Sequence, residues 1–180
     1  MASENDHESL FTDWLREYSA QVIKVARAYT WSKDECEDLA QEILLQAWKS
    51  LPRFRGESNA STWFYRVALH TALNWKRKRV SRGSREENFF EFSRLESSAP
   101  DHAGQLEQTE AIERLYAAIH QLRSTDKVLV LMYLDELSYR EMAEVLGISE
   151  GNVGVKLNRA KKALAKMLNQ ESAEALSDES

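Results

Sequence analysis

The stretch LSYREMAEVLGISEGNVGVKLNRAKKAL, residues 137–164, decides how the rest of the chain is interpreted. Apolar residues recur at helical spacing on both sides of a tight turn, which predicts two short helices that meet at an angle. The small Ala143 lets the helices approach closely, Gly147 can adopt the left-handed turn, and Val153 anchors the second helix in a shared core. This is the spacing of a helix-turn-helix, and we interpret it as a DNA-binding unit over residues 139–158.

Polar residues mark where helices begin. Ser138 and Glu141 stand at the two positions of a capping box, and Ser149 can cap the second helix of the pair. Ser32 and Glu35 repeat the capping-box pattern upstream, at the start of another periodic stretch. The sequence therefore predicts three helix starts from local chemistry alone.

The remaining periodic stretches are also helical. They cover about residues 10–29, 36–51 and 61–79 in the first half, and 112–122 in the second. Pro52 ends the second of these helices. The run VLVLMYL, residues 128–134, would suit a strand, but it has no partner run and lies between helices, so we expect a buried helix capped by Ser124. The predicted fold class is all-α.

The chain divides into two small helical domains. Periodicity fails between about residues 80 and 106, where Ser, Glu, Gly and Pro accumulate, and this indicates a flexible linker. We place the first domain at residues 1–80, the linker at 81–108, the second domain at 109–170 and a polar, frayed tail at 171–180.

The charge is strongly segregated along the chain. The net charge is −5, but residues 76–85 hold six cations and residues 152–170 hold five, with no anion in either segment. Acidic residues gather instead in residues 86–113 and 171–180. Phosphate contacts depend on the potential within a Debye length of about 8–10 Å, so both basic segments are candidate nucleic-acid contacts. Two solvated helix faces are the alternative.

The composition indicates the compartment. The chain has one cysteine, Cys36, which excludes an internal disulfide and suits the reducing cytoplasm. No apolar run reaches the ~18 residues of a membrane helix, and the N-terminus does not resemble a signal peptide. We therefore expect a cytoplasmic protein that does not insert into membranes.

The helix at about residues 61–79 carries a mixed aromatic and basic face. It presents Trp63, Arg66, His70, Asn74 and Arg77. Unstacked bases need aromatic surfaces, and their phosphates need cations, so this face suits single-stranded nucleic acid. The alternative is that Trp63 and Trp75 simply belong to the core.

Three blocks now carry a family resemblance. CEDLAQEILLQAW (36–48), FRGESNASTWFYRVALHTALNWKRKR (54–79) and the helix-turn-helix follow one another in the order and at the distances found in bacterial sigma factors of the extracytoplasmic function group. The resemblance spans about residues 11–79 and 112–168. It implies sigma region 2 in the first domain, sigma region 4 in the second, and a promoter-specificity subunit without a catalytic site, metal or cofactor of its own.

The resemblance also implies partners for particular residues. The clamp helices of the polymerase β′ subunit would dock on Asp38, Leu39, Gln41, Glu42 and Leu45, and the β flap would meet region 4. The promoter −10 element would be opened and read by Phe54, Arg55, Asn59, Ser61, Trp63, Arg66, His70, Asn74, Arg77, Lys78 and Arg79. The −35 element would be read by Glu150, Asn152, Val155, Lys156, Arg159 and Lys162. An anti-sigma factor is the expected regulator.

Two positions depart from the family pattern. His70 stands where many members have asparagine, so the base preference at −10 does not carry over. Gly154 follows Asn152 and Val153 where members often have a basic residue, so the −35 sequence stays open.

Two other functions remain as alternatives. The first is a helix-turn-helix regulator that binds duplex DNA without polymerase, although such a regulator has no need for an acidic docking face followed by an aromatic–basic helix. The second is an enzyme with Glu37, Asp38 and Glu42 as metal ligands, but no His or Cys joins them at ligand spacing.

Overall fold

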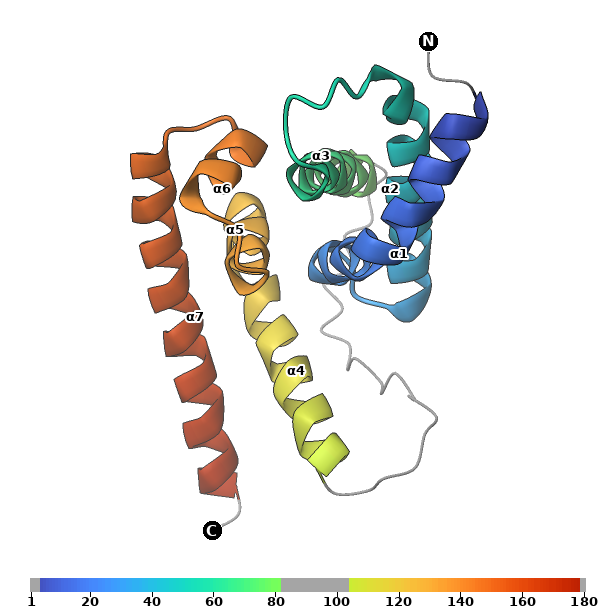
Figure 1. Cartoon of the computed structure of the whole chain (residues 1–180). Helices are drawn as coiled ribbons and strands as arrows, with labels where there is room; N and C mark the ends of the chain where they lie inside the picture. Colours follow the sequence, from blue (N-terminus) through green and yellow to red (C-terminus); the bar gives the residue numbers. More distant parts are fainter. Residues whose placement is uncertain (1–3, 82–103, 179–180) are drawn as a thin grey trace.

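The computed structural model describes residues 4–81 and 104–178, which over these ranges form helices and no strand. Figure 1 shows two groups of helices. The first comprises α1 (Glu4–Tyr29), α2 (Lys33–Ser50), the 3-10 helix η1 (Leu51–Arg53) and α3 (Ala60–Ser81). The second comprises α4 (Gly104–His120), α5 (Ser124–Leu134), α6 (Tyr139–Leu146) and α7 (Glu150–Asp178). The prediction of an all-α chain with two helical domains is confirmed.

The first domain is a bundle in which α1, α2 and α3 each pack against the other two. Each helix contributes the apolar stripe that its periodicity predicts. The side chains buried almost completely in this core include Val22, Val25, Leu39, Ile43, Phe64 and Tyr65. Pro52 lies in η1 directly after α2, because proline has no N–H to continue the helix.

The second domain is organised around α5. The run VLVLMYL is helical as predicted, and residues 128–132 are at most 2% exposed, whereas Tyr133 and Leu134 at its end are 41% and 51% exposed. A helix that is apolar on all sides must be covered on all sides. Within its own domain α5 packs against α6 and α7, and it also packs against α1 and α3 of the first domain.

The helix-turn-helix has the predicted local geometry. Ser138 and Glu141 form both bonds of the capping box, and Ser149 accepts a bond from the Asn152 N–H at 3.3 Å. Gly147 ends α6 with φ of 66°, in the left-handed region where glycine is favoured. Val153 is fully buried between the helices.

Some local predictions are wrong. The cap position of α5 is Arg123, and Ser124 is the first helical residue, with no side-chain cap bond present. Glu35 accepts from the backbone N–H of Trp31 rather than that of Ser32, so only the Ser32 half of the upstream box forms as predicted. Helix α7 continues to Asp178, because the Glu, Ala and Leu of the last segment are good helix formers, so residues 171–178 are helical where we expected fraying.

The predicted linker is only partly open to comparison. Helix α3 ends at Ser81 and α4 begins at Gly104, several residues before the predicted start of the second domain. The rest of the predicted linker, residues 82–103, lies outside the described residues. In the described part of the chain, no helix is long and apolar enough to span a bilayer.

The two domains pack against each other. Helix α1 contacts α4 and α5, and α3 contacts α5 and α6. In Figure 1 α6, the first helix of the helix-turn-helix, stands beside the start of α3. Sequence periodicity predicts two apolar cores but does not predict this contact between them.

Candidate nucleic-acid and polymerase interface

The outer face of α2 carries the residues expected to dock on polymerase. Asp38 and Gln41 are exposed, Glu42 is half-buried, and Leu45 is 44% exposed. Leu39 is fully buried, so its side chain lies on the core face and is not available to a partner. The assignment of Leu39 to the docking surface is therefore wrong. The helical period of 3.6 puts it with Ile43 rather than with Leu45.

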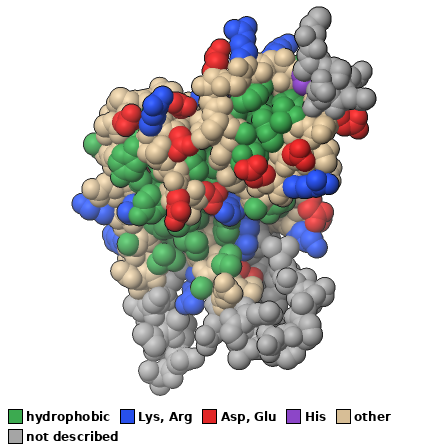
Figure 2. Space-filling view, in the orientation of Figure 1, with side chains coloured by type: hydrophobic (Ala, Val, Ile, Leu, Met, Phe, Trp, Pro, Cys, Tyr) green, Lys and Arg blue, Asp and Glu red, His purple; other side chains and the backbone are tan. Residues whose placement is uncertain are grey.

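An apolar patch extends this face beyond the predicted residues. Trp48 is 40% exposed, and its ring meets the ring of Phe11 edge-on at a centroid distance of 5.1 Å. Figure 2 shows apolar surface in the upper right of the molecule, over α1 and the end of α2, with acidic side chains below it. Exposed aromatic surface rimmed by charge is typical of a protein-binding site. Trp48 lies in the periodic stretch 36–51 and was not among the predicted docking residues.

A groove of about 940 Å³ lies between α2 and α3. Its lining includes six cations and one carboxylate, and these are Lys49, Arg53, Arg66, Arg77, Lys78, Arg79 and Glu42. His70, Asn74 and Trp75 line it as well. Lys49 and Arg53 come from the end of α2 and from η1, outside the segment where we expected the −10 contacts. Only the folding of α2 against α3 brings them to the same groove.

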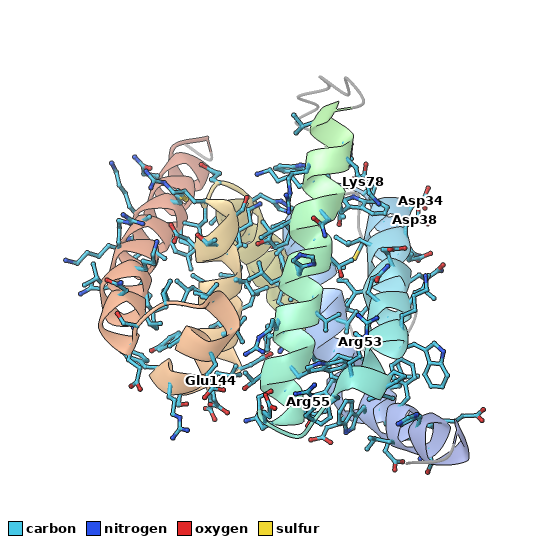
Figure 3. All side chains as sticks on the ribbon, turned by 90° about the horizontal axis from the view of Figure 1, so that it is seen from above. Asp34, Asp38, Arg53, Arg55, Lys78 and Glu144 are labelled. Carbon is cyan, nitrogen blue, oxygen red and sulfur yellow. The ribbon has the colours of Figure 1, made fainter. Side chains whose placement is uncertain are left out.

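Cations lie beside both ends of α3. Figure 3 shows Lys78 toward one end of α3, near the part of α2 that carries Asp34 and Asp38. Arg53 and Arg55 lie toward the opposite end of α3. Arg79 forms an ion pair with Glu35 of α2, so one of the predicted phosphate-binding cations has a partner within the chain. The surface is long and positive, which suits an extended phosphate backbone.

Hydrogen bonds orient the polar groups inside the groove. Arg77 donates to Oδ1 of Asn74 at 2.7 Å, which leaves Nδ2 of Asn74 facing Nδ1 of His70 at 3.2 Å. An amide nitrogen is only a donor, so this contact uses Nδ1 of His70 as the acceptor, and in the neutral ring Nε2 then carries the proton. In that tautomer His70 presents an N–H donor to a ligand.

The large aromatic residues of this region are packed rather than free. Trp63 is half-buried, and its ring lies 5.4 Å from that of Trp14, 5.5 Å from Phe54 and 5.2 Å from Phe64. The core alternative is therefore the better description of Trp63. Phe54 shares the same cluster, 5.0 Å from Trp14. Trp75 is also half-buried, but it lines the groove, and it is not among the residues predicted to bind the −10 element.

Three predicted −10 residues at the start of α3 are bonded to other parts of the chain. Oδ1 of Asn59 accepts from the Thr62 N–H at 2.7 Å and caps α3. Ser61 accepts from Gln21 of α1 at 3.0 Å. Arg66 donates to the backbone carbonyl of Glu144 in α6 at 2.9 Å. Arg55, by contrast, is exposed.

Helix α7 presents the predicted −35 residues on its outer surface. Val153, Leu157 and Ala160 are buried, so the opposite face is turned outward. Glu150, Asn152, Val155, Arg159 and Lys162 are exposed and Lys156 is half-buried. Val155 is 70% exposed.

Two contacts refine this face. Arg159 lies 3.7 Å from the carboxylate of Asp126, a side chain that is only 6% exposed, so Arg159 also compensates a buried charge. A Cβ on Gly154 would lie 3.4 Å from the ring of Tyr139. The first helix of the pair thus supplies a ring beside the position where relatives often have a basic side chain.

Comparison with known proteins agrees with this arrangement. Family models for sigma-70 region 2 and sigma-70 region 4 match residues 14–82 and 112–164. The RNA polymerase sigma factor YlaC of Bacillus subtilis is 33% identical over 165 residues, which are 89% of this chain and 92% of that protein. The ECF RNA polymerase sigma factor SigX of the same species is 30% identical over 152 residues, covering 82% of this chain and 77% of SigX.

A solved structure has the same fold. The sigma factor RpoE of Bartonella quintana, crystallised with the anti-sigma factor NepR, superposes with a TM-score of 0.69 at 22% sequence identity. The match covers 88% of this chain and 96% of that one. The two family matches fall on the two helical domains, and the relatives are similar along most of their length. The chain therefore belongs to the extracytoplasmic function group of the sigma-70 family of RNA polymerase sigma factors.

Proposed function

We propose that this sigma factor docks on core RNA polymerase through the exposed face of α2 and directs it to promoters that it reads at two places. Sigma factors are promoter-specificity subunits, and the polymerase supplies the catalytic site. In this proposal residues 1–80 bind the polymerase clamp and the −10 element, and residues 109–170 bind the −35 element and the β flap.

The groove between α2 and α3 is the single observation that carries the proposal. Six cations line the groove together with His70 and Asn74. Hydrogen bonds between Arg77, Asn74 and His70 orient the two polar side chains. A strand of unpaired DNA would place its phosphates on the cations and the edge of a base against these two side chains. A base can reach them only after it leaves the duplex, at a cost of a few kcal/mol.

The docking surface consists of Asp38, Gln41, Glu42 and Leu45, with Trp48 added and Leu39 removed. Polymerase contact would cover the apolar side chains and pair the acidic ones. This assigns a partner to an exposed apolar patch that a regulator acting alone would not need.

On the second domain, the outward face of α7 would enter the major groove. Asn152 and Lys156 are placed to reach base edges, and Arg159 and Lys162 to reach phosphates or bases. Because Gly154 has no side chain, the preferred −35 sequence would differ from that of relatives with a cation there.

We further propose that the chain works in the cytoplasm and that an anti-sigma factor restrains it. Support comes from the solved relative, which was crystallised with an anti-sigma factor. The partner of this chain would be found by affinity capture from its native cell, with polymerase subunits expected in the same experiment.

Transcription of fragmented genomic DNA by core polymerase tests the function directly. Sequencing the 5′ ends of the transcripts would show start sites that depend on the added chain, with shared sequence near −10 and −35. Asp38→Lys should remove these starts, whereas Asp13→Lys, an equal charge change on exposed α1, should keep them. Specific duplex binding by the chain without polymerase, together with no effect on start sites, would favour the stand-alone regulator.

A further inference from the structure

An apolar side chain, that of Val155, stands in the middle of the outward face of α7. The buried residues Val153, Leu157 and Ala160 define the core side of this helix, where α4, α5 and α6 pack. A helix turns by about 100° per residue, which puts Val155 on the opposite side. It is 70% exposed there. Its two methyl groups therefore point away from the three helices that cover the other side of α7.

The neighbours of Val155 leave its side chain accessible. Residues three and four positions away share the same face of a helix, and for Val155 these are Gly151, Asn152, Asn158 and Arg159. All four are exposed. A helical side chain leans over the preceding turn, which here carries Gly151. A Cβ on Gly151 would meet nothing within 4 Å, so the space beside the valine is open.

This combination of side chains matches the major-groove edge of an A·T base pair. Thymine presents a methyl group in the major groove, whereas guanine and cytosine present only donors and acceptors. An asparagine amide can form two hydrogen bonds with adenine. Asn152 and Asn158 lie on either side of Val155, so amides and an apolar group share one surface. A valine side chain forms no hydrogen bond, so a G·C pair would gain nothing from it.

The charge of α7 favours DNA as the occupant of this surface. Residues 152–170 hold five cations and no anion. Val155 lies in the second turn of α7, and the exposed Lys162 and Lys166 follow it on the same side. The first turns of a recognition helix meet base edges, and cations further along contact phosphates. The apolar centre of the face therefore lies where bases are read.

We propose that Val155 determines specificity at the −35 element by packing its methyl groups against the C5-methyl group of a thymine. The preferred element then contains an A·T pair opposite the middle of the outward face of α7. The inference rests on the proposed function of α7 and adds a base to it. Gly154 leaves the preference at its own position open, whereas Val155 fixes one.

Deoxyuridine tests this contact, because it pairs as thymine does but lacks the C5-methyl group. The probe is a promoter fragment taken from the mapped start sites and bound by the holoenzyme. Each thymine within one helical turn of position −35, on either strand, is replaced in turn by deoxyuridine. We expect one replacement to weaken binding of the wild type roughly fourfold, the effect of one buried methyl group. Val155→Ala should bind that probe and the unmodified promoter equally well.

Two control variants separate the contact from general effects. Val80→Ala makes the same truncation at a 72% exposed residue of α3, and it should keep the wild-type preference for thymine over deoxyuridine. Val155→Ile retains a branched apolar side chain, and it should keep the preference as well. Because Val155 is exposed, Val155→Ala should unfold in urea close to the wild-type midpoint.

Equal affinity of the wild type for the promoter and for every deoxyuridine probe would overturn the inference. A preference for thymine that persists in Val155→Ala would overturn it too, since another residue would then contact the methyl group. In both cases, start sites that depend on the chain would show that the proposed function still holds. The absence of such start sites would refute the proposed function, and this inference with it.

Discussion

Two leucines of α2, six residues apart, provide the sharpest test of the docking surface. Leu39 is fully buried and Leu45 is 44% exposed. Truncation of a fully buried leucine to alanine costs about 2–5 kcal/mol, from lost transfer energy and the cavity that remains. Truncation of an exposed leucine usually changes stability by less than about 0.5 kcal/mol. Leu39→Ala should therefore destabilise the first domain, and Leu45→Ala should leave it unchanged.

Polymerase binding should show the opposite order. If Leu45 is an apolar anchor in the interface, its loss costs about 1–2 kcal/mol of binding, or roughly a 5- to 30-fold weaker Kd. Leu39→Ala makes no direct contact, so under conditions where it remains folded its affinity should stay near that of wild type.

The assay uses two readouts on the same samples. All five tryptophans lie within residues 1–80, so urea unfolding followed by tryptophan fluorescence reports on the first domain. Titration of labelled chain with core polymerase gives the affinity. If Leu45→Ala unfolds early with unchanged affinity, or folded Leu39→Ala loses polymerase, the assignment of the two faces is refuted.

Other predictions address the turn, the −35 face and pH. Gly147→Ala should lower the free energy of unfolding in urea by about 1 kcal/mol, because φ is 66° at this residue. Gly151→Ala in α7 is the control and should not destabilise the chain. Equal effects of the two substitutions would contradict the argument from the turn. Arg159→Ala should weaken holoenzyme binding to duplex −35 DNA by about 1–3 kcal/mol. It also leaves the buried carboxylate of Asp126 without its ion pair, so adding Asp126→Asn should restore stability but not affinity for DNA. Recovery of the affinity in the double variant would mean that Arg159 acts only on the fold. Burial lowers the pKa of His120 to about 3, so the unfolded chain takes up its proton first and stability should fall as pH drops from about 6.5 toward 5. His120→Phe should flatten that slope in urea titrations. A slope that stays the same in His120→Phe would assign it to other groups.

The sequence alone determined the helices and the helix-turn-helix. Capping by Ser138 and Ser149, the left-handed Gly147 and the burial of Val153 all follow from residues a few positions apart. Such features depend on backbone geometry that every helix shares. The resemblance of the chain to sigma factors likewise rests on sequence motifs, which can be recognised without the tertiary structure.

Tertiary structure alone decided which residues of the predicted site are available. Periodicity places Leu39 and Leu45 on one amphipathic helix, but only the position of α1 and α3 decides that the first is covered and the second exposed. Trp63 suits a stacking surface by composition, yet three neighbouring rings pack against it and leave it half-buried. Lys49 and Arg53 join the groove because α2 and α3 lie side by side.

The contact between the domains also belongs to the tertiary structure. The run VLVLMYL predicts that α5 is buried, but not that α1 and α3 supply part of its cover. Asp135 meets Tyr65 across 70 residues and Lys24 across 111, and no local pattern marks such pairs. Hydrophobic burial is non-directional, so a sequence shows how much apolar surface must be covered, and only the fold shows what covers it.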